Sequence, residues 1–315
     1  MKISVVVPLY NKQASIREAL CSVLLQSYQD FEVIVVNDGS TDCGAEIVRT
    51  MALPRVTLIE QQNGGVSAAR NAGIRAASGE WVAFLDADDV WLPNNLACQV
   101  ALLERNPDLK WCAGFFRHRL KGGREQLSLD LDFLKAQLDG EVVRDALALI
   151  PRGYLWTGAV MVRREVFDEI GFMDLALRTA EDLDMWLRIA LRYPRLAYCT
   201  QPLASYTVEV PGSLTKQRVA DPELLPHFLF ARKHLPASLA LPPERSGHLR
   251  LLARSLVATG IKKLLLSGYR RAALKAVEEF RELLGEGDRC RLRLFALAPA
   301  PLLRAGFAAI QTLKG

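Results

Sequence analysis

Cysteine and histidine are scarce in this sequence, and neither is spaced as metal ligands usually are. Six cysteines and four histidines occur in 315 residues. No Cys-x-x-Cys pair and no ligand-like histidine spacing is present, which argues against the common zinc sites. Four of the six cysteines lie inside apolar stretches. We therefore expect buried thiols that stay reduced in a cytoplasmic protein.

Long apolar runs are also missing. No uncharged apolar stretch reaches the ~18 residues that a membrane-spanning helix needs. The first residues lack the apolar core and the small-residue cleavage site of a signal peptide. These absences predict a cytoplasmic chain without a cleaved leader or a spanning helix.

Two kinds of nucleotide-binding loop are absent after the first apolar run. Pro8-Leu9-Tyr10-Asn11 stands where a dinucleotide-dependent dehydrogenase would carry Gly-x-Gly-x-x-Gly. The glycine- and arginine-rich loop with which a sugar-nucleotide pyrophosphorylase holds a triphosphate is missing there too. Both enzyme classes are therefore excluded.

Charge is unevenly distributed along the chain. The net charge is +5, yet residues 222–315 hold 16 lysines and arginines against 7 acidic residues, and residues 1–221 hold 24 against 28. A basic segment favours an anionic partner, such as a lipid headgroup surface or an acidic substrate. Because this segment lacks interleaved aromatic residues, we expect no nucleic-acid partner.

The first hundred residues alternate between two periodicities. Apolar runs rich in β-branched residues predict strands at residues 3–7, 31–36, 56–59 and 81–85, and amphipathic stretches predict helices at residues 15–26, 45–51 and 66–77. This alternation predicts an α/β fold with a Rossmann-like, mostly parallel sheet flanked by helices. The pattern continues with helices at residues 94–105 and 181–192 and strands at residues 111–116, 158–162 and 195–199.

Composition changes at residues 211–226, where three prolines and a glycine interrupt the pattern. Beyond this point the periodicity predicts helices at residues 249–266 and 271–284. The sequence therefore predicts a first domain at residues 1–215 and a helical, basic C-terminal region at residues 216–315.

Polar residues cluster directly after three of the predicted strands. Tyr10 and Asn11 follow the first strand, Asn37-Asp38-Gly39-Ser40 follows the second, and Asp86-Ala87-Asp88-Asp89 follows the fourth. The carboxyl ends of parallel strands meet at one edge, where such sheets bind ligands. Three crowded carboxylates repel one another unless cations neutralise them, and oxygen ligands suit Mn²⁺ or Mg²⁺. Taken alone, each cluster is also explained as a turn or helix cap.

Five motifs in order make the chain resemble the family 2 glycosyltransferases, which have the A-type nucleotide-diphospho-sugar transferase fold. The resemblance covers roughly residues 2–206. The motifs are Val5-Val6-Val7-Pro8-Leu9-Tyr10-Asn11, Val35-Val36-Asn37-Asp38-Gly39-Ser40-Thr41-Asp42, Asn63-Gly64-Gly65-Val66-Ser67-Ala68-Ala69-Arg70-Asn71-Ala72-Gly73, Phe84-Leu85-Asp86-Ala87-Asp88-Asp89 and Ala180-Glu181-Asp182-Leu183-Asp184-Met185-Trp186-Leu187-Arg188.

The resemblance implies donor-binding roles for residues of the first four motifs. Pro8 and Tyr10 would flank the base of the donor, and Asp38 would hydrogen-bond it. Arg70 would lie near the nucleotide, and Asp86 would contact the ribose or a metal-bound water. Asp88 would ligate Mn²⁺ or Mg²⁺ on the diphosphate.

In the fifth motif the resemblance implies that Asp182 is the general base, while Glu181 orients it or binds the acceptor. It further implies an inverting, metal-dependent transfer from a nucleotide diphosphate sugar, with UDP the commonest donor nucleotide. The acceptor would be a glycan or a lipid-linked molecule in cell-envelope or polysaccharide biosynthesis. Processive members carry Gln-x-x-Arg-Trp and membrane spans, and both are missing here, which predicts single additions. A catalytically silent, transferase-like binding protein is the alternative.

The basic C-terminal end has the pattern of an interfacial helix. Arg289, Arg291 and Arg293 precede an apolar run, and Leu302, Phe307 and other apolar residues follow at helical spacing. Such a pattern predicts peripheral attachment to an anionic membrane surface, on the inner face of the cell membrane. The alternative is a helical subdomain that packs on the first domain.

Overall fold

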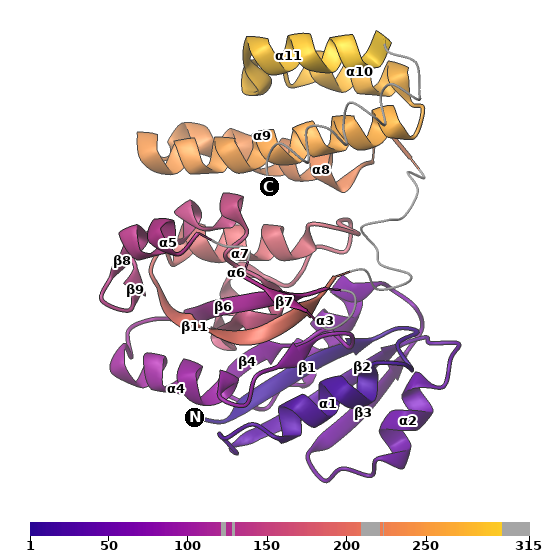
Figure 1. The fold of residues 1–315 in the computed structure, drawn as a ribbon, viewed down its shortest axis with the longest axis vertical. Coiled ribbons are helices and arrows are strands. Elements are labelled where there is room, and N and C mark those ends of the chain that lie inside the picture. The colour runs from indigo at the N-terminus through magenta and orange to yellow at the C-terminus, as the bar shows by residue number, and fades with distance from the viewer. Residues whose placement is uncertain (121–123, 128–129, 209–220, 223, 298–315) are drawn as a thin grey trace. The chain divides into compact units, whose positions relative to one another are not determined.

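The computed structural model describes residues 1–120, 124–127, 130–208, 221–222 and 224–297 (Figure 1). The chain divides into two compact units, Met1–Ser213 and Leu214–Gly315. Each unit has its own hydrophobic core, and we describe each separately.

Within the described residues, the first unit contains one sheet of eleven strands. Its strands are β1 (Ile3–Leu9), β2 (Phe31–Asp38), β3 (Val56–Gln61), β4 (Trp81–Phe84), β5 (Val90–Trp91), β6 (Trp111–Arg119), β7 (Glu125–Gln126), β8 (Leu138–Asp139), β9 (Val142–Val143), β10 (Val160–Arg163) and β11 (Leu196–Thr207). Their order is β3-β2-β1-β4-β10-β6-β11-β9-β8, with β5 paired to β11 and β7 to β6.

β1 occupies the point at which the direction of strand order reverses. It pairs in parallel with β2 on one side and with β4 on the other. Its valines are completely buried because helices cover both faces of a parallel sheet. The loops after β1 and β4 therefore emerge side by side, at the switch point where open α/β sheets form ligand crevices.

The helices of this unit alternate with the strands, as the periodicity predicted. They are α1 (Ile16–Leu24), α2 (Gly44–Thr50), α3 (Val66–Ala76), α4 (Asn95–Arg105), α5 (Leu131–Gln137), α6 (Glu165–Ile170) and α7 (Glu181–Arg192). α3 approaches β1 closely at Gly73, where a Cβ atom would lie 2.3 Å from Val6 Cγ1. α7 packs through Trp186 against Phe84 of β4, with ring centroids 6.1 Å apart.

The predicted fold class is confirmed, but several local predictions are wrong, including the single helix predicted at residues 271–284, which is split between Arg270–Glu279 and Arg281–Leu297. Residues 157–159 form a short 3₁₀ helix, η3 (Thr157–Ala159), and β10 follows it in the antiparallel direction between β4 and β6. Cys21, Cys43 and Cys290 are exposed and not buried. Cys21 is exposed because the buried residues of α1, including Ala19, Leu20 and Val23, lie on the other face of the helix.

The second unit is helical within its described residues. It contains α8 (Pro226–His234), η5 (Leu235–Ala240), α9 (Pro243–Leu266), α10 (Arg270–Glu279) and α11 (Arg281–Leu297). Phe228 stacks on Phe280 at 5.8 Å in its core. α9 begins earlier than the periodicity predicted, because a proline is well tolerated in the first turn of a helix. None of the described helices combines the length and apolar character needed to cross a membrane.

Candidate active site

The predicted donor-site residues lie along one edge of the sheet. Leu9 of β1 is in register with Asn37 of β2, and Val6 with Phe84 of β4, so the three loops that follow these strands are neighbours. Tyr10 is half exposed and Pro8 is partly buried. The sheet topology therefore brings together residues from three separate sequence motifs.

Asp38 is enclosed by the loop that leads into α3. Its carboxylate accepts hydrogen bonds from Gln61 Nε2 at 2.7 Å and from the backbone amides of Gly64 and Gly65, each at 2.8 Å. Gly65 adopts a φ of 89°, a left-handed conformation that favours glycine. The side chain is 3% exposed. Its observed contacts are with the protein's own loop, and this loop-organising role was not evident from the motif.

Arg70 joins two motifs that are far apart in the sequence. From α3 its guanidinium donates through Nη2 to Asp86 Oδ1 at 2.6 Å and through Nη1 to Glu181 Oε1 at 2.8 Å. Burial alone would lower the pKa of Arg70, but the charges of Asp86 and Glu181 raise it above its ordinary value. Arg70 Nε has no partner in the described part of the chain. A permanent positive charge therefore lies between the acidic loop and the start of α7.

The two acidic residues at the start of α7 have different environments. Glu181 is 8% exposed and paired with Arg70. Asp182 is only partly buried, accepts from the Leu183 amide at 2.8 Å, and has Thr157 Oγ1 3.4 Å from its other oxygen. Of the two, Asp182 is the one without an ion pair to Arg70 and is better suited to accept a proton.

Both carboxyl groups have raised pKa values. Burial raises the pKa of Glu181 to about 7, helped by the negative charge of Asp182 and opposed by Arg70. Burial also raises the pKa of Asp182, and Arg70 partly offsets that effect. A carboxylate whose pKa is raised toward neutrality is a stronger base than an ordinary one.

The loop after β4 contains three carboxyl groups in distinct settings. Asp86 pairs with Arg70, and Asp88 Oδ2 lies 2.6 Å from Lys12 Nζ. Asp89 is 1% exposed and accepts from the Thr207 amide of β11 at 2.7 Å. Burial, followed by the charges of Asp86 and Asp88, raises the pKa of Asp89 well above its ordinary value.

Sequence reasoning missed Lys12 and Thr207. Lys12 lies one residue beyond the first motif, and a lone cation shortly after the first predicted strand was its only signal. Thr207 had no signal, because its contribution is a backbone amide at the end of β11.

The residues at the sheet edge fit a divalent ion that draws most of its ligands from a substrate. The described residues contain no group of three His, Cys, Asp or Glu side chains able to hold an ion alone. Asp86 and Asp88 keep 28% and 20% of their side chains exposed, and both offer only oxygen. Mg²⁺ typically binds through one or two carboxylates together with phosphate oxygens and waters.

Four aromatic rings border this edge. Trp156 contacts Phe116 with ring centroids 5.0 Å apart and Tyr206 with centroids 5.6 Å apart, and His118 contacts Phe116 and Tyr206. Tyr206 immediately precedes Thr207, whose amide donates to Asp89. Burial, then the charges of Asp89 and Asp88, raise the pKa of Tyr206. This group of rings therefore extends from Trp156, which precedes Thr157, to Tyr206, which precedes the residue that binds Asp89.

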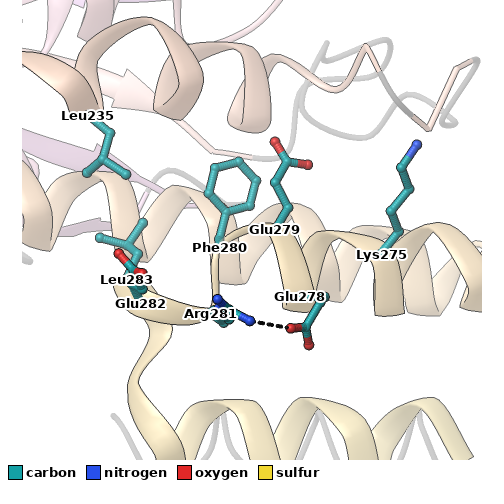
Figure 2. A pocket seen from close by; sticks show the side chains of 8 residues that line it. All are labelled: Leu235, Lys275, Glu278, Glu279, Phe280, Arg281, Glu282 and Leu283. Atoms are coloured by element: carbon teal, nitrogen blue, oxygen red, sulfur yellow. Dashed lines mark hydrogen bonds and ion pairs between the residues drawn. The ribbon is translucent and has the colours of Figure 1, made fainter.

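The helical unit has a separate depression of about 880 Å³. Figure 2 shows its lining, in which Phe280 and Leu283 lie among charged residues and Arg281 pairs with Glu278 at 3.2 Å. It contains none of the predicted site residues. Its mixed charge gives no indication of a nucleotide-binding surface.

Comparison with known proteins identifies related sequences. The model of Glycosyl transferase family 2 matches residues 4–171. An uncharacterized glycosyltransferase of Rickettsia felis is 32% identical over 192 residues, 59% of this chain and 31% of the relative. YibD of Escherichia coli K12, also an uncharacterized glycosyltransferase, is 33% identical over 65% of this chain and 61% of its own length. The chain thus spans about a third of the Rickettsia relative.

Solved structures share the fold. S. aureus TarS 1–349 in complex with UDP-GlcNAc has a TM-score of 0.70 at 19% identity, over 98% of this chain and 92% of that one. The mannosyltransferase PcManGT of Pyrobaculum calidifontis, in complex with GDP-Man and Mn²⁺, has a TM-score of 0.58 at 23% identity, over 98% and 80%. These likenesses confirm the A-type glycosyltransferase fold. Because the family model matches more than half of the chain, the chain belongs to glycosyl transferase family 2.

Proposed function

We propose that this protein is an inverting glycosyltransferase that moves one sugar at a time from a nucleotide diphosphate donor to an acceptor hydroxyl. The observation that carries the proposal is the Arg70 bridge, in which one buried guanidinium links Asp86 of the acidic loop to Glu181 of α7. This contact brings the proposed donor side and the proposed base side of the reaction together. We assign catalysis to residues 1–215 and treat residues 216–315 as an accessory helical region.

The donor would lie across the switch point of the sheet. Pro8 and Tyr10 would flank its base, Asp38 would keep the base-binding loop in place and hydrogen-bond the base, and Asp86 would meet the ribose. TarS binds UDP-GlcNAc and PcManGT binds GDP-Man in their solved structures. We expect a UDP-sugar as the donor here.

Asp88 would be the protein ligand of Mn²⁺ or Mg²⁺, with Asp86 beside it. The bound ion would supply charge neutralisation for the departing nucleoside diphosphate. Lys12 contributes a further positive charge at the same place, 2.6 Å from Asp88. PcManGT was solved with Mn²⁺, which supports the choice of a divalent ion.

Asp182 would take the proton from the acceptor hydroxyl as that oxygen attacks the anomeric carbon. Its pKa is raised by burial, and it lies beside Thr157, the residue that follows Trp156 in the chain. One base and no covalent nucleophile give a single displacement, which inverts the anomeric configuration. Glu181, paired with Arg70, would orient the start of α7.

The acceptor would be a glycan or a lipid-linked molecule in cell-envelope or polysaccharide biosynthesis. The notion of a peripheral membrane protein rests on the basic C-terminal region. Leu294 and Leu297 near the end of α11 are 67% and 76% exposed. The proposed interfacial helix beyond them, at residues 298–315, lies outside the described residues.

A donor screen tests the function directly. Thermal unfolding of the full chain would be followed with a panel of nucleotide sugars, each with Mn²⁺ and with EDTA. We expect a rise in Tm for one donor class that depends on Mn²⁺, as ligand binding to the folded state requires. Transfer would then be assayed with that donor. If no nucleotide sugar shifts the Tm in the presence of Mn²⁺, the proposal is wrong.

A further inference from the structure

A second cavity in the first unit lies away from the proposed donor and acceptor residues. It has a volume of about 270 Å³, and its lining comes from α4, from Gly140 and Glu141, and from residues 198–201 of β11. Two cysteines, Cys98 and Cys199, line it together.

The two thiols lie in the same small cavity. Cys98 is half-buried on α4 and Cys199 is 9% exposed on β11. After burial, the nearby Cys98 side chain also raises the pKa of Cys199, as expected of two sulfurs that lie close together. Arg105, about two turns further along α4, also lines the cavity, and its guanidinium pairs with Glu141 at 2.9 Å.

The neighbouring thiol, Cys112, is not part of this pair. It is fully buried, and its Sγ–H group donates to Gln99 Oε1 at 3.3 Å. Cys21, Cys43 and Cys290 are exposed elsewhere on the chain. Among the cysteines, Cys98 and Cys199 are therefore the two that line one cavity together.

We propose that Cys98 and Cys199 are a redox-active dithiol, which a small disulfide such as glutathione disulfide converts into an intramolecular disulfide. No step of the proposed glycosyl transfer uses either residue, so this inference does not depend on the proposed function.

The exchange would proceed in two balanced steps. The Cys98 thiolate attacks one sulfur of glutathione disulfide, which forms a mixed disulfide and releases one glutathione thiolate. The Cys199 thiolate then attacks the Cys98 sulfur, which forms the Cys98–Cys199 bond and releases the second glutathione. Two protein thiols are oxidised, one glutathione disulfide is reduced to two thiols, and two protons pass to solvent and the leaving thiolates.

The order of attack follows from the surroundings of the two thiols. Burial raises the pKa of Cys199 to about 11, so little of it is thiolate near neutral pH. Cys98 is the more accessible of the two. Cys98 is therefore the attacking residue, and Cys199 is the resolving residue that acts within the mixed disulfide.

The bond would tie α4 to β11 across a loop of roughly 100 residues, which restricts the unfolded chain strongly. β11 continues from Cys199 to Thr207, whose amide holds Asp89. Oxidation would thus fix the strand that supports the acidic loop. We expect the oxidised protein to have a higher Tm than the reduced protein.

The test uses the full chain with Cys21, Cys43 and Cys290 replaced by serine, next to the wild type. Folded protein is incubated with glutathione disulfide in mildly alkaline buffer, alkylated, and mapped by mass spectrometry without reduction. We expect a peptide pair joined through Cys98 and Cys199, and a rise in Tm that dithiothreitol reverses. Stable glutathione on Cys98 without the cross-link, or no reaction at either residue, would overturn the proposal.

Single variants separate the two roles. C199S should accumulate one glutathione on Cys98, because no resolving thiol remains. C98S should stay unmodified at Cys199 over the same time. If both variants incorporated the same amount of glutathione, Cys98 would not be the attacking residue and Cys199 would not be the resolving residue. Circular dichroism of each variant checks that both remain folded.

Discussion

Lys12 and Asp88 form an ion pair of 2.6 Å that joins the loop after β1 to the loop after β4. These loops flank the switch point of the sheet, because β1 and β4 are parallel neighbours. A carboxylate at this point already interacts with one cation. It is therefore suited to interact with a metal ion that accompanies a diphosphate.

Asp88→Asn keeps the shape of the side chain and removes its negative charge. We expect a loss of transfer activity of ~10²-fold or more, since a metal ion supplies several kcal/mol of transition-state stabilisation. Calorimetry should show weaker Mn²⁺ binding in the presence of UDP. Asp108→Asn, which changes an exposed acid paired with Arg195, is the matched control. Unchanged kcat at saturating Mn²⁺ would remove Asp88 from the metal site.

Arg70→Met removes the guanidinium and leaves Asp86 and Glu181 without their shared partner. Breaking a buried ion pair from one side costs about 3–5 kcal/mol, because an uncompensated charge remains in the interior. Urea denaturation measures this loss. Arg195→Ala breaks an exposed ion pair and should change the unfolding free energy little by comparison. Equal effects of the two substitutions would show that the Arg70 bridge is not structurally important.

Asp182→Asn tests the general base. We expect kcat to fall by ~10²–10⁴, the usual contribution of a general base, while the Kd for the donor stays nearly unchanged. A base must be deprotonated, and the pKa of Asp182 is raised. Wild-type kcat should therefore decline, as pH falls, at a higher pH than an ordinary aspartate would give. A large rise in donor Kd with intact kcat would assign Asp182 to the donor site instead.

Glu181→Gln tests the raised pKa through protein stability. The pKa of Glu181 is about 7 in the folded chain against an ordinary value of 4.5. Between pH 4.5 and pH 7, Glu181 is more often protonated in the folded state than in the unfolded state. Its contribution to the free energy of unfolding of the wild type therefore decreases as the pH rises. The Gln variant lacks this dependence. We therefore expect the unfolding free energy of the Gln variant, minus that of the wild type, to increase between pH 4.5 and pH 7. Urea denaturation at several pH values measures this difference. A difference that stays constant with pH would contradict the raised pKa.

Truncation tests membrane attachment. A cut before Arg289 would remove Leu292 and Ala296, which are buried in the helical core, so the chain should end after Leu297 instead. Wild type should sediment with anionic vesicles at low salt, since each basic residue near such a surface contributes about 1 kcal/mol. The truncated chain should not, because it lacks the apolar residues of 298–315 that would insert into the surface. Equal sedimentation of both chains, or none, would exclude residues 298–315 as the anchor.

The alternation of strand and helix could be predicted from sequence because burial imposes period two or 3.6 on neighbouring residues. The amphipathic α7 is an example of the helical period. The continuous valine run of β1 indicates a strand buried on both faces. The loop motifs could be predicted for the same local reason, since polar residues directly follow each strand. Residue type and order along the chain thus determined the fold class and the identity of the candidate site residues.

The pairing of those residues was decided only by the tertiary structure. Arg70 reaches Glu181 across 111 positions of the sequence, and Cys98 and Cys199, separated by a similar number of positions, line one cavity. Asp38 turned out to hold the amides of Gly64 and Gly65, and Lys12 to pair with Asp88. Such contacts depend on the order of the strands in the sheet. They also depend on which side chains of different elements face one another after the core has packed. Periodicity contains no information about either, because it reports only which face of its own element a residue occupies.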